Sequence, residues 1–429
     1  MHDSVNIVAV KTPEVRKVFS FQAALSAVLS FEFVFGFFLL SSRIKATPAL
    51  SWIPFDLTGA SLAVLSVCGG WILARRRFRL HGPGLLVVAA GVLFLGYAAG
   101  SMAWSPGVNY ASEKAVYLLT VALWPMIAAG LIIAYEPERL KRFLFFIVMG
   151  ALILAGGALV SYIQQPGGFV QVFGGRYLGV GRFASIGASI LLGFFFLFRA
   201  DRAWKVLAAA TLVPLLVSIL IIGARGPAIA LILSALVPVA AAVFVPRYRK
   251  AIVFGAVTLF VGAAIFFTQV DIPLTIQRLF VLLEPQGGAS AGARMEFYRH
   301  ALAFWEVKPV FGFGAGSWPI LYLGEDVRAY PHNLYLEVVV ETGLVGFLLL
   351  SVWMLVAFRT LGSWQQIRTE PMRLLLLMCF VNLFFNALVS GDLTDNRLFF
   401  FILACMAIRL PDRAQNFRRN STSEAPNLP

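Results

Sequence analysis

Charged side chains are scarce in this sequence. Only 13% of its 429 residues are Asp, Glu, Lys or Arg, whereas soluble globular proteins carry about 25%. Hydrophobic residues make up 59% of the chain. A soluble protein of this length needs a hydrophilic surface that this composition does not supply, so we interpret the chain as an integral membrane protein.

Motifs for nucleotides, metals and disulfides are also missing. The three cysteines, Cys68, Cys379 and Cys405, lie inside apolar runs without a CxxC neighbour, which argues against a disulfide framework and a cysteine metal site. No Walker-type loop, dinucleotide fingerprint or His/Cys/Asp cluster with metal spacing occurs. The sequence therefore gives no signal for a cofactor, a bound metal or a nucleotide energy source.

Apolar runs long enough to cross a hydrocarbon core of about 30 Å recur along the chain. They predict an all-α integral membrane protein with about twelve transmembrane helices. The first run is too long for a cleavable signal peptide, so we expect it to remain as the first span. The expected limits are 18–40, 50–73, 84–103, 114–134, 143–163, 183–198, 206–222, 228–245, 251–270, 333–357, 374–390 and 394–409.

The net charge of +14 is distributed in short clusters between the apolar runs. Nucleic-acid binding would be the simplest reading of so basic a protein, but every alternate loop is basic, as the positive-inside bias predicts. We therefore expect both termini in the cytoplasm. The expected parts are a tail at 1–17, nine spans within 18–270, an outer loop at 271–332, three spans within 333–409, and a disordered tail at 410–429.

The outer loop at 271–332 is much longer than most of the other loops, and such loops usually carry function. Its composition is not of low complexity, and helical spacing runs from Arg294 to Trp305. We expect a short helical subdomain that lies on the outer surface of the bundle. The sequence shows no internal repeat, which argues against a transporter, because many transporter folds have two similar halves.

Four basic residues fall on the outer side, where the topology predicts few: Arg182, Arg225, Arg294 and His332. Arg182 follows two glycines that permit close approach of a ligand, and a snorkelling interfacial arginine is an equal alternative. Arg225 lies in a tight turn and needs an anionic partner. We favour a ligand phosphate over a carboxylate from a neighbouring span.

Arg294 opens the helical stretch of the loop, with Tyr298 on the same face. A solvated amphipathic helix is the alternative for this pair. His332 follows Pro331 at the start of the tenth span, and a neutral imidazole there is available as a general base. A satisfied interfacial histidine is the alternative for His332.

Several further polar groups lie in or beside the spans. Glu337 and Glu341 follow His332 one turn apart, where they would pair with Arg225 or Arg182 or orient His332. Interhelical hydrogen bonding is expected for Glu32, Asn382 and Asn386. The acidic turn at 391–397 would bind a divalent cation or a sugar hydroxyl, but a helix-capping turn is favoured.

The stretch from Arg294 to Gly346 resembles the signature region of the O-antigen ligase and polymerase superfamily. That pattern has an arginine and a tyrosine in a loop helix, a proline, alternating glycines, a His-Asn pair, and a glutamate with two glycines in the next span. The matching residues are Arg294, Tyr298, Pro309, Gly312-Phe313-Gly314-Ala315-Gly316, His332-Asn333, Glu341, Gly343 and Gly346.

This resemblance implies a GT-C-like glycosyltransferase in the bacterial inner membrane, with its active site facing the periplasm. Family members move a glycan from an undecaprenyl diphosphate carrier. Ligases transfer it to the lipid A core, polymerases to another lipid-linked repeat, and related members to protein Ser or Thr. Two positions depart from the family pattern: Ala224 replaces the usual serine before Arg225, and the segment after Arg182 lacks an expected asparagine.

The resemblance and the residues predict one scheme. Arginines neutralise the diphosphate leaving group, and His332 takes the proton of the acceptor hydroxyl in a single inverting displacement. We predict a lipid A core ligase, with an O-antigen polymerase or protein O-oligosaccharyltransferase as the first alternative and a transporter or lipid flippase as the second. The predicted substrate-binding residues are Arg182, Arg225, Arg294, Tyr298, Asn333 and Glu337.

Overall fold

A computed structural model describes residues 30–165, 170–173, 177–198, 201–246, 248–249, 253, 274–281 and 289–410. All regular elements in these ranges are helices, as predicted. Nine of them are long and apolar enough to cross a membrane. The chain is therefore an all-α integral membrane protein.

Seven of the nine candidate spans precede the long loop, and two follow it. The first seven are α3 (Leu57–Arg75), α4 (Gly82–Gly100) with the turn that follows it, the broken helix Asn109–Ile133, α7 (Pro137–Gln164), α8 (Tyr177–Leu197), α9 (Arg202–Ile221) and α10 (Arg225–Phe244). The last two are α15 (Leu334–Leu361) and α17 (Pro371–Val389). The segment Asn109–Ile133 contains α5 (Asn109–Tyr117), α6 (Leu123–Ala128) and two π-helical turns.

The nine helices correspond to the second to eighth, tenth and eleventh expected spans. In place of the first, the described part begins with α2 (Phe31–Ile44). The ninth expected span and the two expected tails lie almost entirely outside the described residues. The total of twelve therefore stays a prediction.

The last expected span, 394–409, contains a helix of only nine residues, α18 (Arg397–Cys405). The chain leaves the helix after Cys405, and the Arg409 N–H donates to the Ala134 carbonyl at 2.9 Å. The helix is shorter than expected because the residues before it form a capped turn and those after it bond to the end of a neighbouring helix. Hydropathy alone detects neither contact.

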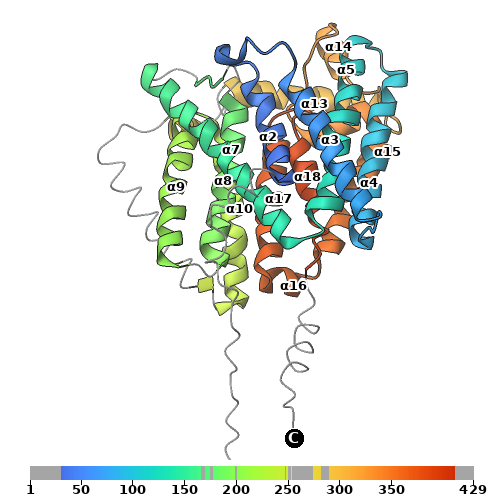
Figure 1. The fold of residues 1–429 in the computed structure, drawn as a ribbon. Helices are drawn as coiled ribbons and strands as arrows, with labels where there is room; N and C mark the ends of the chain where they lie inside the picture. The colour runs from blue at the N-terminus through green and yellow to red at the C-terminus, as the bar shows by residue number, and fades with distance from the viewer. Residues whose placement is uncertain are drawn as a thin grey trace, which may run out of the picture.

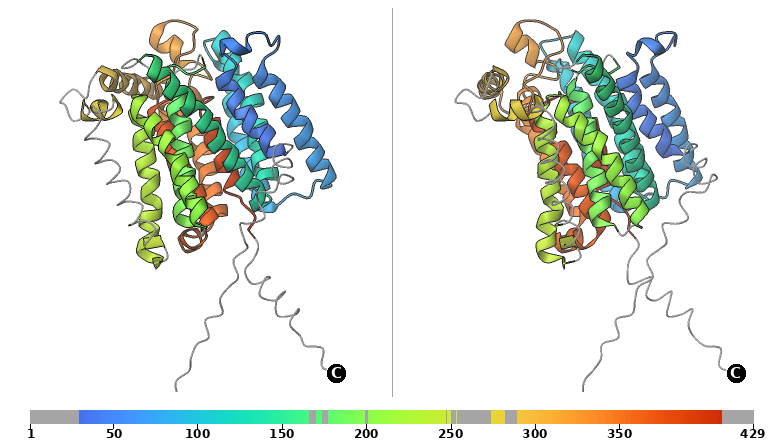
Figure 2. Two further views of the ribbon diagram at one scale, coloured as in Figure 1. Left: turned by 60° about the vertical axis from the view of Figure 1, so that its left-hand side comes forward. Right: turned by 90° about the vertical axis from the view of Figure 1, so that its left-hand side faces the viewer.

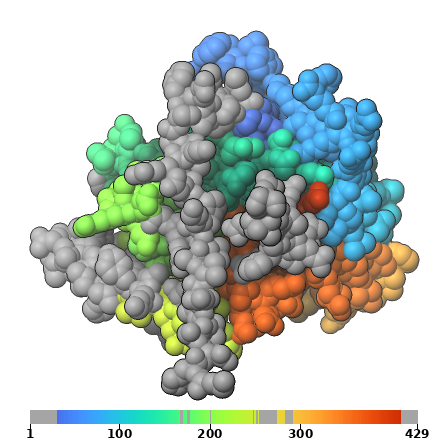
Figure 3. All heavy atoms as spheres, turned by 60° about the horizontal axis from the view of Figure 1, so that its bottom comes forward, coloured from blue at the N-terminus to red at the C-terminus, as the bar shows by residue number. Residues whose placement is uncertain are grey.

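The described residues of the long loop form three helices: α12 (Leu274–Phe280), α13 (Ala289–Val307) and α14 (Trp318–Leu323). Figures 1 and 2 show α13 and α14 at one end of the bundle and α16 (Trp364–Thr369) at the other. We call the first the loop end and the second the basic end. Figure 3 turns the basic end toward the viewer.

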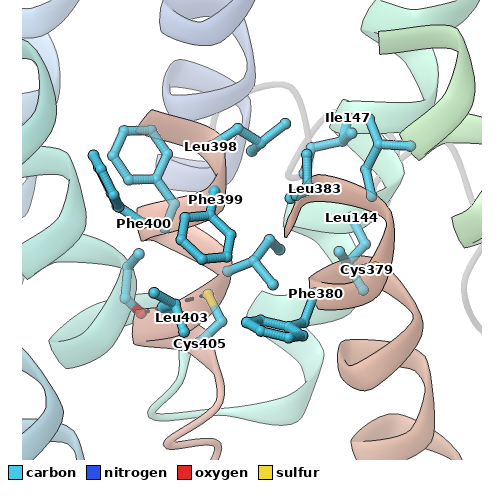
Figure 4. Packing of buried hydrophobic residues seen from close by; sticks show 14 of the residues in the cluster. Leu144, Ile147, Cys379, Phe380, Leu383, Leu398, Phe399, Phe400, Leu403 and Cys405 are labelled. Carbon is cyan, nitrogen blue, oxygen red and sulfur yellow. Dashed lines mark hydrogen bonds between the residues drawn. The ribbon is translucent and has the colours of Figure 1, made fainter. Parts of the chain in front are cut away.

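The core is built from tightly packed apolar side chains, because helices in a membrane associate through close packing rather than through expulsion of water. Figure 4 shows Phe399 and Phe400 of α18 in one cluster with residues of α17 and α7. Cys379 and Cys405 are buried in this cluster as free thiols.

Polar groups within the core bond to one another across helices, as predicted for Glu32 and Asn382. The prediction is wrong for Asn386, whose side chain donates to Asn382 within α17. Asn382 of α17 donates to the Ser185 and Ser189 hydroxyls of α8 at 2.7 and 2.9 Å. Glu32 of α2 is fully buried and pairs with Arg139 of α7 at 2.7 Å. These contacts fix the register of neighbouring helices where apolar packing alone would permit sliding.

Candidate functional site

The first half of α15 is separated from the second by a break at Gly343, where φ is 64° and ψ is −162°. The segment 309–314 docks against this break. Its Phe313 and Gly314 N–H groups donate to the Val340 and Glu341 carbonyls, both at 2.8 Å. The Pro309 carbonyl accepts from the Leu344 N–H, also at 2.8 Å. The loop thus replaces hydrogen bonds that the interrupted helix has lost, as a membrane-embedded break requires.

Glycine is required on both sides of this contact. A Cβ atom on Gly343 would lie 2.3 Å from the Val310 carbonyl oxygen, and one on Gly312 would lie 2.6 Å from the Glu341 carbonyl carbon. Both residues also have positive φ, which L side chains rarely adopt. The glycines of the loop and of α15 therefore permit the backbone-to-backbone packing that holds the loop end against the bundle.

A buried ion cluster lies beside the break. The Lys114 ammonium of α5 is 2.5 Å from Glu337 Oε1 and 2.6 Å from Glu341 Oε2, and all three side chains are buried. The sequence prediction that these carboxylates pair with Arg225 or Arg182 is thus wrong. Lys114 lies 223 residues from Glu337 along the chain, so sequence spacing gives no sign of the pairing.

Glu337 also fixes the turn at 391–397, since its Oε1 accepts the Leu393 N–H at 3.0 Å. Within this turn Asp392 Oδ1 accepts the Asp395 N–H at 2.7 Å, and Asp392 Oδ2 accepts from Arg328 Nε at 3.0 Å. These bonds lie within the turn itself, and the N-cap residue of α18, Asn396, makes no side-chain capping hydrogen bond, so the favoured helix-capping role is not observed. The described ranges contain no group of three or more His, Cys, Asp or Glu side chains that could hold a metal ion.

The C-terminal end of α17 gathers three of the predicted binding residues. Arg182 donates to the Ser390 carbonyl and, at 3.3 Å, to the Asn386 carbonyl. Tyr298 Oη and Asn333 Nδ2 both donate to the Leu388 carbonyl, at 3.4 and 3.0 Å. Donors and a cation are favourable at the end of a helix, where carbonyls lack partners.

Asn333 and the glycine before Arg182 make further structural contacts. Asn333 is the N-cap of α15, because its Oδ1 accepts the Tyr335 and Leu336 N–H groups at 3.0 and 3.1 Å. The glycine that precedes Arg182 packs against protein, since a Cβ on Gly181 would lie 3.2 Å from the Ala224 Cβ. Asn333 and Gly181 therefore position the site instead of presenting free groups to a ligand.

His332 occupies the turn directly before this N-cap. Its φ of 60° lies in the left-handed region, an unusual conformation for a residue other than glycine. The imidazole stacks on Phe297 of α13 with ring centres 6.0 Å apart and meets Tyr330 edge-on at 4.6 Å. Its Nδ1 is buried without a hydrogen-bond partner among the described residues. Packing from two elements thus fixes the ring.

The electrostatic surroundings keep His332 neutral. Burial, followed by the positive charges of Arg294 and Arg182, lowers the pKa of His332 from 6.5 to about 4. Asp395 and Asp392 act in the opposite direction with smaller effect. A neutral imidazole accepts a proton, so the ring is in the state that a general base requires at neutral pH.

Arg225 and Arg278 are neighbours, and the charge of Arg294, which acts on His332, also acts on Arg225. Arg225 Nη1 donates to the Arg278 carbonyl at 3.2 Å, and Arg278 Nη1 donates to the Gly223 carbonyl at 3.0 Å. The charges that act most strongly on Arg225 are those of Arg294 and Arg278, both of the same sign. Like charges held close together indicate a place for an anion. Arg278, on the short helix α12, was not among the predicted residues.

Arg294 connects the arginines to the imidazole. Its charge acts on both Arg225 and His332. The side chain is half-buried, and within the described part of the chain it makes no hydrogen bond or ion pair. The structure therefore joins Arg225, Arg278, Arg294 and His332 in one electrostatic cluster, whereas Glu337 belongs to the separate Lys114 cluster.

Residues 210–351 match a family model described as O-antigen ligase. This region, about a third of the chain, is similar to the O-antigen ligase superfamily. The matched region contains Arg225, Arg278, Arg294 and His332, whereas Arg182 and Lys114 lie outside it. A comparison with curated proteins found no match. The family match and the apolar helices together support a multi-pass membrane protein with a ligase- or polymerase-type function. Members of the matched family are glycosyltransferase-like enzymes that act on lipid-linked glycans.

Proposed function

We propose that the protein is an O-antigen ligase of the bacterial inner membrane. It transfers a glycan from undecaprenyl diphosphate to the lipid A core oligosaccharide at the loop end, which faces the periplasm. The family match and the basic turns at the opposite end support this orientation, because arginine and lysine favour the cytoplasmic side. The polyprenyl chain lies between helices in the lipid.

The observation that carries the proposal is the position of Arg294. It is a half-buried cation without a bonded partner in the described ranges, and its charge acts on both Arg225 and the imidazole of His332. An anion bound by Arg294 therefore lies next to the candidate base. A diphosphate linked to a sugar is such an anion, and its reacting carbon adjoins the charged oxygens.

Arg225, Arg278 and Arg294 bind the diphosphate in this proposal. Guanidinium groups match phosphate oxygens with two parallel hydrogen bonds. The negative charge on the leaving diphosphate grows as the bond between it and the anomeric carbon breaks. Preorganised cations stabilise that charge more in the transition state than in the ground state, which is the condition for catalysis.

His332 accepts the proton of the attacking hydroxyl in this proposal. The acceptor oxygen forms a bond to the anomeric carbon while the bond to the diphosphate breaks, and the configuration inverts. The bound diphosphate offsets the charges of Arg294 and Arg182 that disfavour the imidazolium. Donor binding thus raises the pKa of His332 and makes it a stronger base when the substrate is present.

A reconstituted transfer assay tests this function. Purified protein in vesicles receives the glycan on undecaprenyl diphosphate, with lipid A core, a second lipid-linked repeat or a protein as acceptor. Glycan on lipid A core is the expected product. Longer lipid-linked glycan would assign a polymerase instead, glycoprotein a protein O-oligosaccharyltransferase, and movement of donor without a new glycosidic bond a flippase.

Replacement of His332 with Ala is expected to lower transfer by about 10² to 10⁴-fold, the usual effect of losing a general base. His300→Ala is the matched control, because His300 lies on α13 and contacts Tyr322 and the Glu296 carbonyl. Transfer by the His332 variant at the level of the control would remove His332 from the mechanism.

A further inference from the structure

The basic end contains a cavity of about 390 Å³, open to the surface, between the α3–α4 turn and the start of α7. Its lining is almost entirely cationic and consists of Arg75, Arg76, Arg77, Arg79 and Tyr135. Figure 3 shows this end of the molecule, with α3 and α4 in blue at the upper right. The cavity lies at the opposite end of the bundle from the arginine–histidine cluster.

The arginines of this cavity are incompletely neutralised. Arg76 Nη2 pairs with Glu136 at 2.7 Å, but its Nη1 is buried without a hydrogen-bond partner among the described residues. Arg77 and Arg79 are exposed and make no ion pair within the same ranges. The nearby Glu32 is already shared by Arg139 and Arg142. The cavity therefore has several donors and an excess of positive charge.

The turn that supplies these arginines is held in an unusual backbone conformation. Arg77 and Phe78 have φ values of 50° and 51°, in the left-handed region that residues with side chains seldom occupy. Tyr135 packs under the guanidinium of Arg76, with the ring centre 4.3 Å away, and also contacts Arg409 at 5.2 Å. A strained turn and a stacked arginine hold the cationic groups around one space.

Apolar aromatic side chains flank the cavity at the surface. Trp71 is 61% exposed and Phe78 is 65% exposed. The Arg75 guanidinium lies over the Trp71 ring at 5.0 Å. Tryptophan and arginine side by side at the end of a spanning helix are typical of the boundary between hydrocarbon and headgroups. A ligand in this cavity thus has access both to cations and to the membrane.

We propose that this cavity binds the phosphate-bearing headgroup of an anionic phospholipid in the adjacent leaflet. The arginines bind the phosphate, and the exposed aromatic rings contact the glycerol and acyl regions. A soluble phosphate would use the same cations but would gain nothing from Trp71 and Phe78. The site is independent of glycan transfer, so it stands or fails separately from the proposed function.

The wild-type protein provides the first test. Purified full-length protein in detergent is titrated with phosphatidylglycerol, phosphatidylcholine or inorganic phosphate, and bound lipid is measured by native mass spectrometry together with the unfolding temperature. Phosphatidylglycerol is expected to bind and to raise the unfolding temperature more than phosphatidylcholine does. Equal binding of the two lipids, or stabilisation by inorganic phosphate alone, would overturn the proposal.

A double variant, Arg77→Gln with Arg79→Gln, locates the site. Each arginine near an anionic lipid contributes about a fivefold factor, so the variant is expected to bind phosphatidylglycerol about 30-fold more weakly. The matched control is Arg202→Gln with Arg359→Gln, which removes two exposed arginines from the same end but outside the cavity. Equal weakening in the two variants would show a general charge effect and contradict a defined site.

A lysine pair at the same positions guards against loss of folding or of membrane orientation. Arg77→Lys with Arg79→Lys keeps the charge that favours the cytoplasmic side, and retained glycan transfer confirms an intact loop end. This variant is expected to bind phosphatidylglycerol several-fold more weakly than wild type but better than the glutamine pair, because ammonium groups lack the planar fork. If all three proteins bound the lipid equally, the cavity would not be its site.

Discussion

Two groups of charges at the loop end differ in how they are satisfied. In the Lys114 cluster one cation lies between two buried carboxylates at hydrogen-bonding distance. In the arginine–histidine cluster the cations act on one another, and Arg294 has no bonded partner among the described residues. The first group is complete within the protein, whereas we propose that an anion from outside completes the second. This difference separates a structural from a binding role better than residue type does.

Loss of Lys114 is expected to have the largest effect on stability. Lys114→Met leaves two buried carboxylates without their cation, and breaking a buried pair typically costs about 3–5 kcal/mol. The free energy of unfolding of the purified protein measures this. Lys141→Met is the control, since Lys141 pairs with Glu138 at the surface and exposed pairs contribute about 1 kcal/mol or less. Equal stability of the two variants would mean that the cluster is not structural.

Arg294→Gln is expected to lower glycan transfer strongly and to change the free energy of unfolding little, in contrast to Lys114→Met. Removal of one preorganised donor to a developing charge costs about 10²-fold or more in turnover. Arg299→Gln on the same helix is the control, because Arg299 is exposed. The comparison between the two charge groups would break down if Arg294→Gln unfolded the protein or left transfer at the control level.

The pH dependence of transfer sharpens the same contrast. The low pKa of His332, caused by burial and by Arg294 and Arg182, places the acidic limb of kcat/KM near pH 4, because this parameter reports the free enzyme. Bound diphosphate raises the pKa of His332, so the acidic limb of kcat is expected at higher pH. If the acidic limbs of kcat/KM and kcat both lay near pH 6.5, the cations would not act on the His332 ring.

The smallest effect on the free energy of unfolding is expected from Asp326, which caps a helix at the loop end. Asp326 accepts the Val108, Asn109 and Tyr110 N–H groups at the start of α5, at 2.8 to 3.0 Å. These bonds, chiefly that from Tyr110, lower the pKa of Asp326. The stabilisation of the fold by the Asp326 carboxylate is therefore present at neutral pH and is lost as pH falls through the lowered pKa.

Asp326→Ala is expected to cost about 1 kcal/mol of unfolding free energy, the usual cost of losing an N-cap. The neighbouring exposed residue supplies the control, Glu325→Ala, which is expected to change the free energy little. If Asp326→Ala lowered the free energy of unfolding as much as Lys114→Met does, surface and buried charges at the loop end would contribute equally to stability.

The sequence predicts the fold class and most spans because hydropathy is a local property. It also selects Arg182, Arg225, Arg294 and His332 as candidates, since basic groups at the outer ends of apolar runs are unusual, and their roles stay predictions. The partner of Glu337 and the role of Arg278 depend on contacts between distant segments, which spacing does not reveal. The glycines at 312 and 343 are visible in the sequence, but their docking at the break in α15 is not.

The length of α18 also depends on tertiary contacts. Residues 394–409 are apolar enough for a full span, yet the helix covers only Arg397–Cys405. Asp392 caps the turn before it, and Arg409 bonds to Ala134 after it. Composition predicts that this segment is buried, whereas its secondary structure is decided by the groups it meets.

The central claim is that one anion site joins the arginines to His332, and NMR titration of the histidine rings tests it directly. The sequence has four histidines, and His332→Ala assigns the relevant signal. The pKa of His332 is expected at about 4 in the free protein and higher after an undecaprenyl diphosphate-linked sugar binds, with no such rise on donor addition in Arg294→Gln. A pKa near 6.5 that bound donor leaves unchanged would contradict the account.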